Sequence, residues 1–273
     1  GDVLLLFVVV GVVLFLTRSW SDRAIGVAAV VLLLQPVEWY HYIANLINPA
    51  HRLPDLKVAE MYGEVADYTK AGNWRDFLLG NVTLGQKASF LWAVNAGRFV
   101  QTAGLFLLGF FIGRKQLFMT NEKNIVFWTK VLIISAISFA PLYTLKELVM
   151  ENDPIVQQTV GTAFDMWQKL AFTLVLVASF ILYQHKNFSK AVAGLRFYGK
   201  MSLTNYISQS IIGAFIYFPI GLNLAPYCGY TLSLSVGFLI FLLQLKFCKW
   251  WLARHKQGPL ESIWHKWTWM GRK

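Results

Sequence analysis

The chain has 273 residues, of which 56% are hydrophobic and only 14% are charged, and its formal net charge is +11. A soluble domain would carry about 25% charged residues, so the composition excludes an ordinary soluble enzyme. Apolar stretches of about 20 residues recur, the length that crosses the hydrocarbon core, and predict an all-α polytopic membrane protein with one membrane domain over residues 1–273.

Seven spans are expected in chain order. They cover residues 3–16, 24–44, 90–112, 125–149, 163–183, 201–218 and 230–247. The first is short because the chain opens inside an apolar helix, at Gly1-Asp2-Val3-Leu4. That opening has no basic n-region and no cleavage site, so it is not a signal peptide. We therefore expect a fragment that lacks N-terminal spans.

Basic residues predict the orientation. They gather in alternate connections and in the tail: Arg18, Arg23, Arg114, Lys115, Lys123, Lys186, Lys190, Arg196, Lys200, Lys249, Arg254, Lys256, Lys266, Arg272 and Lys273. The other short connections, residues 151–161 and 219–229, contain no base. The positive-inside rule then places the C-terminus in the cytoplasm of a multi-pass protein. Because the bases flank spans, the expected partner is the lipid bilayer and not a nucleic acid.

Residues 45–89 form a long external segment. Asp55 is suited to capping a helix in which Val58, Met61, Tyr62, Val65 and Tyr68 follow helical spacing. Ala71-Gly72-Asn73 interrupts that helix, and residues 74–79 start a second apolar stripe. We expect a helical hairpin at the membrane surface rather than a simple linker, because structureless connections of this length are uncommon.

Charged residues inside apolar runs are the strongest functional signal. A rise of about 1.5 Å per residue places Asp2 and Glu38 ~21 Å above the inner boundary, and Arg98 ~10 Å below the outer one. All three then share a level in the outer half of a core ~30 Å thick, with Lys169 close to that level and His41 one turn above Glu38. Buried charges of this kind usually face a polar interior.

Two interpretations of this level stay open. In the first, Asp2, Glu38, His41, Arg98 and Lys169 form a polar pocket where Arg98 holds an anionic group and the acids or His41 move protons. In the second, the charges form a structural ion pair and Lys169 extends outwards. Asn205 and Gln209, four residues apart, present the same choice between a polar path and interhelical hydrogen bonds.

Metal and cofactor signals are weak. The five histidines form no HExxH pair, so no metal site is expected. Cys228 and Cys248 lie about one membrane thickness apart and are not expected to form a disulfide.

Two C-terminal motifs carry a family resemblance. The first is Gly199-Lys200-Met201-Ser202-Leu203-Thr204-Asn205-Tyr206, followed by Gln209-Ser210 and Gly213. The second is Gly258-Pro259-Leu260-Glu261, preceded by Trp251-Leu252 and followed by Trp264 and Thr268. With the Gly1-Asp2-Val3-Leu4 element and the Leu-Gly-rich stretch before Arg114, they resemble the YeiB-like bacterial inner-membrane proteins. The C-terminal part of those proteins is catalogued as domain of unknown function 418.

The resemblance implies a bacterial inner-membrane location and a C-terminal signature region over residues 196–273. It also implies missing N-terminal spans that carry an Asp-x-x-Arg-Gly motif. At this chain's His265 the family usually has Arg, and at Ser262 it usually has Trp. These departures argue against a charge-specific role for the tail.

Three functions follow from these observations. At fold level the family is similar to transmembrane acyltransferases, which implies transfer from a cytoplasmic donor such as acyl-coenzyme A to an outer-facing small-molecule, lipid or glycan acceptor. Donor phosphates would then meet Arg114, Lys186, Lys190, Arg196 and Lys200. The alternatives are a transporter and a non-catalytic scaffold. No pair of Gly- or Pro-broken spans in matching positions is evident, which counts against transport.

Overall fold

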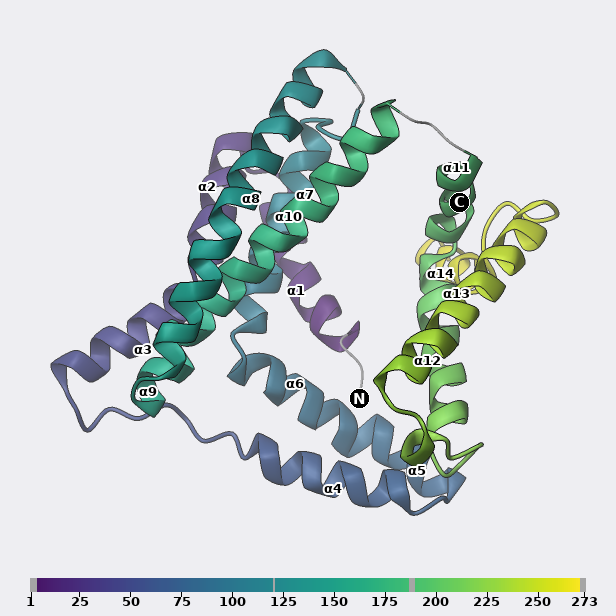
Figure 1. The fold of residues 1–273 in the computed structure, drawn as a ribbon, viewed down its shortest axis with the longest axis horizontal. Coiled ribbons are helices and arrows are strands. Elements are labelled where there is room, and N and C mark those ends of the chain that lie inside the picture. Colours follow the sequence, from purple (N-terminus) through teal and green to yellow (C-terminus); the bar gives the residue numbers. More distant parts are fainter. Residues whose placement is uncertain (1–3, 120, 187–189, 271–273) are drawn as a thin grey trace. The chain divides into compact units, whose positions relative to one another are not determined.

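The computed structural model describes residues 4–119, 121–186 and 190–270, and all its regular elements are helical (Figure 1). Asp2 therefore lies outside the described residues. Packing divides the chain into two compact units. The first comprises Gly1–Val65 and Asn81–Lys186, and the second comprises Ala66–Gly80 and Asn187–Lys273.

The first unit begins with α1 (Leu4–Thr17), α2 (Asp22–Leu33) and α3 (Pro36–Ile47). It continues with η1 (Asn81–Gly85), α6 (Gln86–Asn95), α7 (Arg98–Arg114) and α8 (Glu122–Met150). The short α9 (Pro154–Val156) leads through η2 (Gln157–Gly161) into α10 (Thr162–Lys186). In Figure 1, α8 and α10 run alongside each other as a long pair.

α7 lies at the centre of this unit, because each of its faces packs against a different partner. Leu107 packs with Ile25 and Ala29 of α2. Ile112 packs with Trp128 of α8, whose indole Nε1 donates to the Leu117 carbonyl at 2.7 Å. A third cluster joins α7 to α1 and α6 through Leu6, Val10, Ala93 and Ala103.

Three helical segments are long and apolar enough to cross a membrane: Glu122–Met150, Pro154–His185 and Tyr230–Leu252. The number rises to five among the described residues if each of two bent helix pairs counts as one span. α1 is an apolar helix of only 14 residues, and α12 (Ser202–Tyr217) has 16. The chain is thus an all-α, multi-pass membrane protein, while the count of seven spans stays a prediction.

Two of the expected spans are bent at a short break, so each is a broken span or a re-entrant segment. Both breaks were missed by reasoning from the sequence, and whether they occupy matching positions stays a prediction. Asp22–Leu33 and Pro36–Ile47 meet at an angle of 48°. Trp74–Asn95 and Arg98–Arg114 meet at 79°. The depths assigned to Glu38 and Arg98 assumed unbroken helices over residues 24–44 and 90–112, so that arithmetic does not hold.

The expected hairpin within residues 45–89 is present as two helices, α4 (Val58–Lys70) and α5 (Trp74–Gly80), separated by residues 71–73. Asp55 does not cap α4 directly. Its carboxylate accepts from the Lys57 N–H at 2.9 Å, one residue before the helix starts, so it forms a turn instead. From α5 the chain continues through η1 into α6, without the new start at Phe90 that the sequence indicated.

The second unit contains α5, α11 (Lys190–Lys200), α12, η3 (Ala225–Tyr227), α13 (Tyr230–Leu252) and α14 (Pro259–Thr268). Phe77 of α5 packs on Phe218 with ring centroids 5.5 Å apart. α14 is short and is not a candidate span, since its apolar residues occupy one side only.

Candidate functional site

The two helix breaks of the first unit meet each other. A Cβ atom placed on Gly97 would lie 2.5 Å from the Glu38 Oε1, so the Glu38 carboxyl group rests against the backbone of the second break. About two turns along α7, a Cβ on Gly104 would lie 2.9 Å from the Leu33 Cγ. Glycines at both positions therefore allow α7 to approach the end of α2 and the start of α3 closely.

Local chemistry explains each break. Pro36 is the first residue of α3 and lacks an N–H, so α2 cannot continue through it. Gln35 before it takes a left-handed conformation, with φ of 59°. Gly97, with φ of +63°, follows the last residues of α6 and forms the N-terminal cap of α7. A glycine in this conformation is the common way to end a helix.

Buried polar atoms without partners concentrate at these breaks. They are both amide atoms of Gln35, the Oε2 of Glu38 and the Nε of Arg98, which are four of the six such atoms among the described residues. Gln35 is fully buried and Glu38 is 8% exposed. By contrast, the Leu33 carbonyl freed by the first break accepts from the Trp167 Nε1 at 2.8 Å. Because buried polar groups normally have partners, the remaining atoms mark a place for water or a polar ligand.

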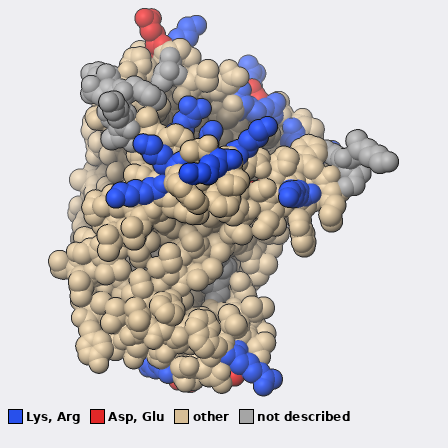
Figure 2. Space-filling view, turned by 90° about the vertical axis from the view of Figure 1, so that its right-hand side faces the viewer, with Lys and Arg blue, Asp and Glu red and all other residues tan. Residues whose placement is uncertain are grey.

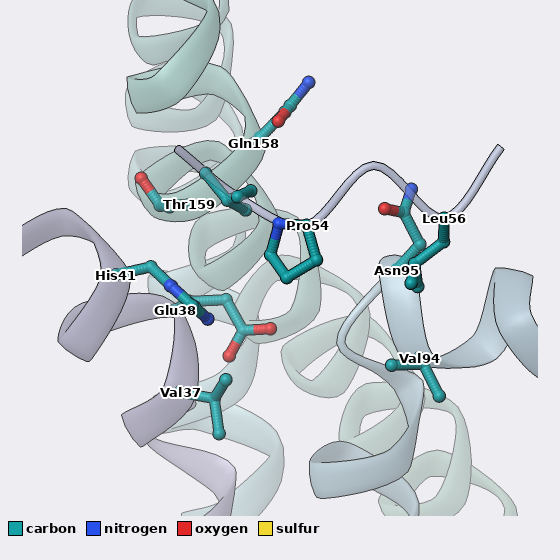
Figure 3. Close-up of a pocket in the computed structure, with 10 residues that line it drawn as sticks. Val37, Glu38, His41, Pro54, Leu56, Val94, Asn95, Gln158 and Thr159 are labelled. Carbon is teal, nitrogen blue, oxygen red and sulfur yellow. The ribbon is translucent and has the colours of Figure 1, made fainter. Parts of the chain in front are cut away.

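Glu38 and His41 line one cavity of about 140 Å³ (Figure 3). Figure 3 shows the Glu38 carboxyl group beneath the loop that carries Pro54, with Thr159 and Gln158 on the neighbouring helix. Those two residues belong to η2, a π-helix, an irregularity frequent at functional sites. A cavity of this size suits a few waters or a small polar group and is below the usual size of drug-like ligand sites.

A larger hollow of about 550 Å³ adjoins the cavity and shares Leu53 and Gln158 with it. Arg52 and Asp153 place charges of both signs on its wall. The irregular segment 48–57 contributes lining residues to both spaces. His51 in that segment contacts His41 of α3, with the His41 Nδ1 3.0 Å from the His51 Nε2. The segment thus covers the Glu38 cavity and is attached to it through the imidazole pair.

Arg98 begins α7, directly after Gly97, so its backbone lies close to Glu38. Its guanidinium group, however, donates to the Gln101 Oε1 at 3.1 Å and lies 5.8 Å from the Trp92 ring centroid. No Arg98–Glu38 ion pair is present among residues 4–119. Whether Asp2 joins this group stays a prediction.

Lys169 belongs to a different cluster. Its ammonium group pairs with Asp165 on the same helix, and Asp165 also pairs with Lys146 at 3.4 Å. Lys169 is about half exposed, whereas Asp165 is largely buried. The Lys169 side chain is not part of the lining of the Glu38 cavity.

The residues proposed for donor phosphates are distributed over both units. Arg114 is engaged, since its Nε lies 3.1 Å from an Asp22 oxygen and its NH1 donates to the Trp20 carbonyl at 2.8 Å. Arg196 and Lys200 are exposed on α11. The side chains of Lys186 and Lys190 lie outside the described ones.

Asn205 and Gln209 join a hydrogen-bonded network in the second unit. The Gln244 Nε2 donates to the Asn205 carbonyl at 3.1 Å and to the Ser208 Oγ at 2.7 Å. The Gln209 Nε2 donates to the Tyr198 hydroxyl at 2.7 Å. Burial raises the pKa of the Tyr198 phenol above its usual range. This network ties α11, α12 and α13 together through fully engaged side chains.

The two C-terminal motifs contact each other through Glu261. Its carboxylate accepts from the Thr204 backbone N–H at 3.0 Å and from the Thr204 hydroxyl. The Thr204 Oγ1 in turn accepts from the Leu260 N–H at 3.2 Å. Glu261 therefore caps the N-terminus of α12 from another helix, and the two motifs form one structural contact.

Several functional candidates were missed by reasoning from the sequence. Gln35, Gly97 and Trp167 were not singled out, although Gln-Pro and Ala-Gly steps inside apolar runs are helix-stop signals. No local signal marks Trp167, because its partner Leu33 is 134 residues away.

Comparison with known proteins adds one assignment. No curated protein and no solved structure matches the chain. The family described as "Protein of unknown function (DUF418)" matches residues 112–271, which is more than half of the chain. The chain therefore belongs to the DUF418 family.

Proposed function

We propose that the protein transports a small polar solute across the membrane through the region where α2–α3 and α6–α7 are broken. The observation that carries this proposal is the meeting of two broken helices around buried polar atoms that lack partners. Transporters commonly bind solutes where discontinuous helices expose helix termini inside the membrane.

Glu38 has the position that proton-coupled binding requires. It is the third residue of α3, so its carboxyl group lies near the N-terminal end of that helix. Its Oε1 also lies against the N-terminal cap of α7. A proton or a cationic group arriving at Oε2 would meet no competing hydrogen bond. Glu38 is therefore proposed as the group that exchanges a proton with the solute.

Labelling of a cavity residue from both sides of the membrane tests transport, and it does not require that the solute is known. Thr159 is fully buried and lines the cavity, and Thr159→Cys changes its size little. With Cys228 replaced by Ser, we expect this Cys to react with membrane-impermeant thiol reagents both in intact cells and in inverted vesicles. Both signals should fall when segment 48–57 is cross-linked to α3 through His41→Cys and His51→Cys.

Two control positions calibrate this labelling. Glu147→Cys should react only in intact cells and Gln184→Cys only in inverted vesicles, as the positive-inside rule predicts. Reaction of Thr159→Cys from one side alone contradicts transport. Reaction of Gln184→Cys in intact cells contradicts the proposed orientation.

A second function, acyl transfer, is supported by the acid–imidazole wall of the cavity. Glu38 and His41 are three residues apart on α3 and share one face. Either group can take a proton from an acceptor hydroxyl, whose oxygen then attacks the thioester carbonyl of an acyl-coenzyme A. The carbon–sulfur bond breaks and the thiolate leaves with a proton. The engagement of Arg114 with Asp22 gives less support to the donor side.

Release of free thiol from acetyl-coenzyme A by the purified protein separates the two functions. Acyl transfer predicts release in the presence of a hydroxyl acceptor, with a loss of about 10²–10⁴-fold in Glu38→Gln or His41→Asn. Glu147→Gln, an exposed acid on α8, is the matched control and should change nothing. If the wild-type protein releases no thiol and Thr159→Cys is labelled from both sides of the membrane, transport is the function that remains. Absence of both results would favour a scaffold.

A further inference from the structure

The last part of the chain carries a strongly one-sided charge. Within residues 187–273, Glu261 is the only acidic residue, and it is occupied in capping α12. Bases are frequent over the same range: Lys190, Arg196, Lys200, Lys246, Lys249, Arg254, Lys256, Lys266, Arg272 and Lys273. Figure 2 shows Lys and Arg gathered over the upper part of one face, above a broad area without charge.

An apolar groove lies in this unit between α12 and α14. Its volume is about 610 Å³. Leu203 and Ile207 of α12 line it from one side, and Leu260, Ile263, Trp264 and Trp267 of α14 line it from the other. Trp264 is 66% exposed and Trp267 is 73% exposed, although both belong to the apolar stripe of the helix. The part of the chain that the structure describes therefore leaves a large apolar surface open here.

The position of α14 places this groove at the membrane surface. α13 is a candidate span that ends at Leu252, and α14 begins at Pro259, only a short loop later. The N-terminus of α12 is fixed to α14 through Glu261 and Thr204. Tryptophan side chains favour the boundary between headgroups and hydrocarbon. The groove thus opens at the level where lipid headgroups meet acyl chains.

We infer that this groove binds one anionic phospholipid, with an acyl chain between α12 and α14 and the headgroup attracted by the Lys and Arg side chains of this unit. The apolar lining matches an acyl chain, and the unbalanced positive charge matches a phosphate with a further negative charge. A basic amphipathic helix beside a span is the sequence pattern that anionic lipids recognise. A zwitterionic phospholipid offers the same chains but a weaker electrostatic attraction.

Native mass spectrometry of the full chain tests this inference. The protein in detergent is equilibrated with equal amounts of phosphatidylglycerol and phosphatidylcholine that have identical chains. We expect bound phosphatidylglycerol to exceed phosphatidylcholine by roughly tenfold. Ile207→Trp fills the groove and should remove most of this excess. Ile211→Trp, one turn further along α12 and outside the groove, should retain it.

Charge variants separate the headgroup contribution from the groove. Lys200→Gln with Lys266→Gln should lower the excess several-fold, whereas Lys70→Gln on α4 should not. If the wild-type protein binds equal amounts of phosphatidylglycerol and phosphatidylcholine, the inference is wrong. An unchanged excess in Ile207→Trp that folds like wild type would also overturn it.

Photo-crosslinking identifies what occupies the groove in the membrane. With benzoylphenylalanine in place of Ile263, we expect crosslinks to phospholipid. A crosslink to another segment of this chain, or to a second copy, would mean that protein covers the groove, and the inference would fail.

Discussion

Gly97→Ala should cost about 2–4 kcal/mol of stability and disrupt the candidate site. Two causes act together. An alanine at φ of +63° carries the strain of a left-handed residue, and its Cβ would lie 2.5 Å from the Glu38 Oε1. The carboxyl group must then move away from the break. Thermal unfolding in detergent, followed by size-exclusion chromatography, should show a midpoint lower by about 5–15 °C.

A double-mutant cycle separates the two causes. Glu38→Ala removes the steric conflict but leaves the backbone strain, so the double variant should recover part of the loss and no more. Gly109→Ala on the same helix is the control, because a Cβ there meets nothing within 4 Å. Equal losses for the Gly97 and Gly109 variants would show that Gly97 does not hold the break in place.

Glu261→Ala should destabilise the C-terminal unit by about 2–3 kcal/mol, although Glu261 is only partly buried. The carboxylate accepts from the N–H and the hydroxyl of Thr204, and its removal leaves the N-terminus of α12 without this cap. Hydrogen–deuterium exchange at the first turn of α12 should rise in the variant. The same measurement on Tyr230–Leu252 should change less, because α13 does not depend on this contact.

Two variants define the chemistry of that contact. Glu261→Gln keeps one carbonyl oxygen as an acceptor and should lose about half as much stability. Ser262→Ala, at the next residue of α14, should have almost no effect. If Glu261→Ala exchanges hydrogen at the wild-type rate, the two motifs are joined by packing alone.

The sequence was sufficient for the all-α, multi-pass fold class because the hydropathy of each apolar stretch is an average over many residues. The orientation inferred from Lys and Arg stays a prediction. The hairpin of α4 and α5 was also predictable, since Ala71-Gly72-Asn73 is a strong helix breaker. The breaks at Gln35-Pro36 and Ala96-Gly97 were missed because each lies within an apolar run that a hydropathy average treats as continuous. Single-residue stop signals inside such runs need separate inspection.

The candidate site was predictable only in part. Glu38, His41 and Arg98 stood out because charge in an apolar run is rare, and the structure places Glu38 and His41 on one cavity. Thr159 and the Trp167–Leu33 hydrogen bond depend on contacts between residues more than 100 positions apart, for which one sequence carries no signal. The four-residue spacing of Asn205 and Gln209 left their role open, and the structure adds their hydrogen bonds to Gln244 and Tyr198. A polar path past these residues stays a prediction.

The second unit is discontinuous in the chain, and this has a consequence for synthesis. Residues 66–80 leave the ribosome well before their partners in residues 187–273. Phe77, 9% exposed in the folded chain, must wait for Phe218. Phe218 follows Phe77 by 141 residues, so at about 5–20 residues per second the delay is roughly 7–28 s. A chaperone or the lipid surface would have to shield the apolar side of α5 during that interval.

Because of the same discontinuity, the region that matches the family, residues 112–271, does not coincide with either compact unit. Residues 112–271 include α8 and α10 of the first unit but leave out α2 and most of α7. In the whole chain α7 packs against α8 and α10, and α2 packs against α7. They also leave out Phe77. A gene trimmed to residues 112–271 would therefore yield a chain with two incomplete cores. Because the residues before 112 are synthesised first, they act as an assembly factor for the rest of the same chain.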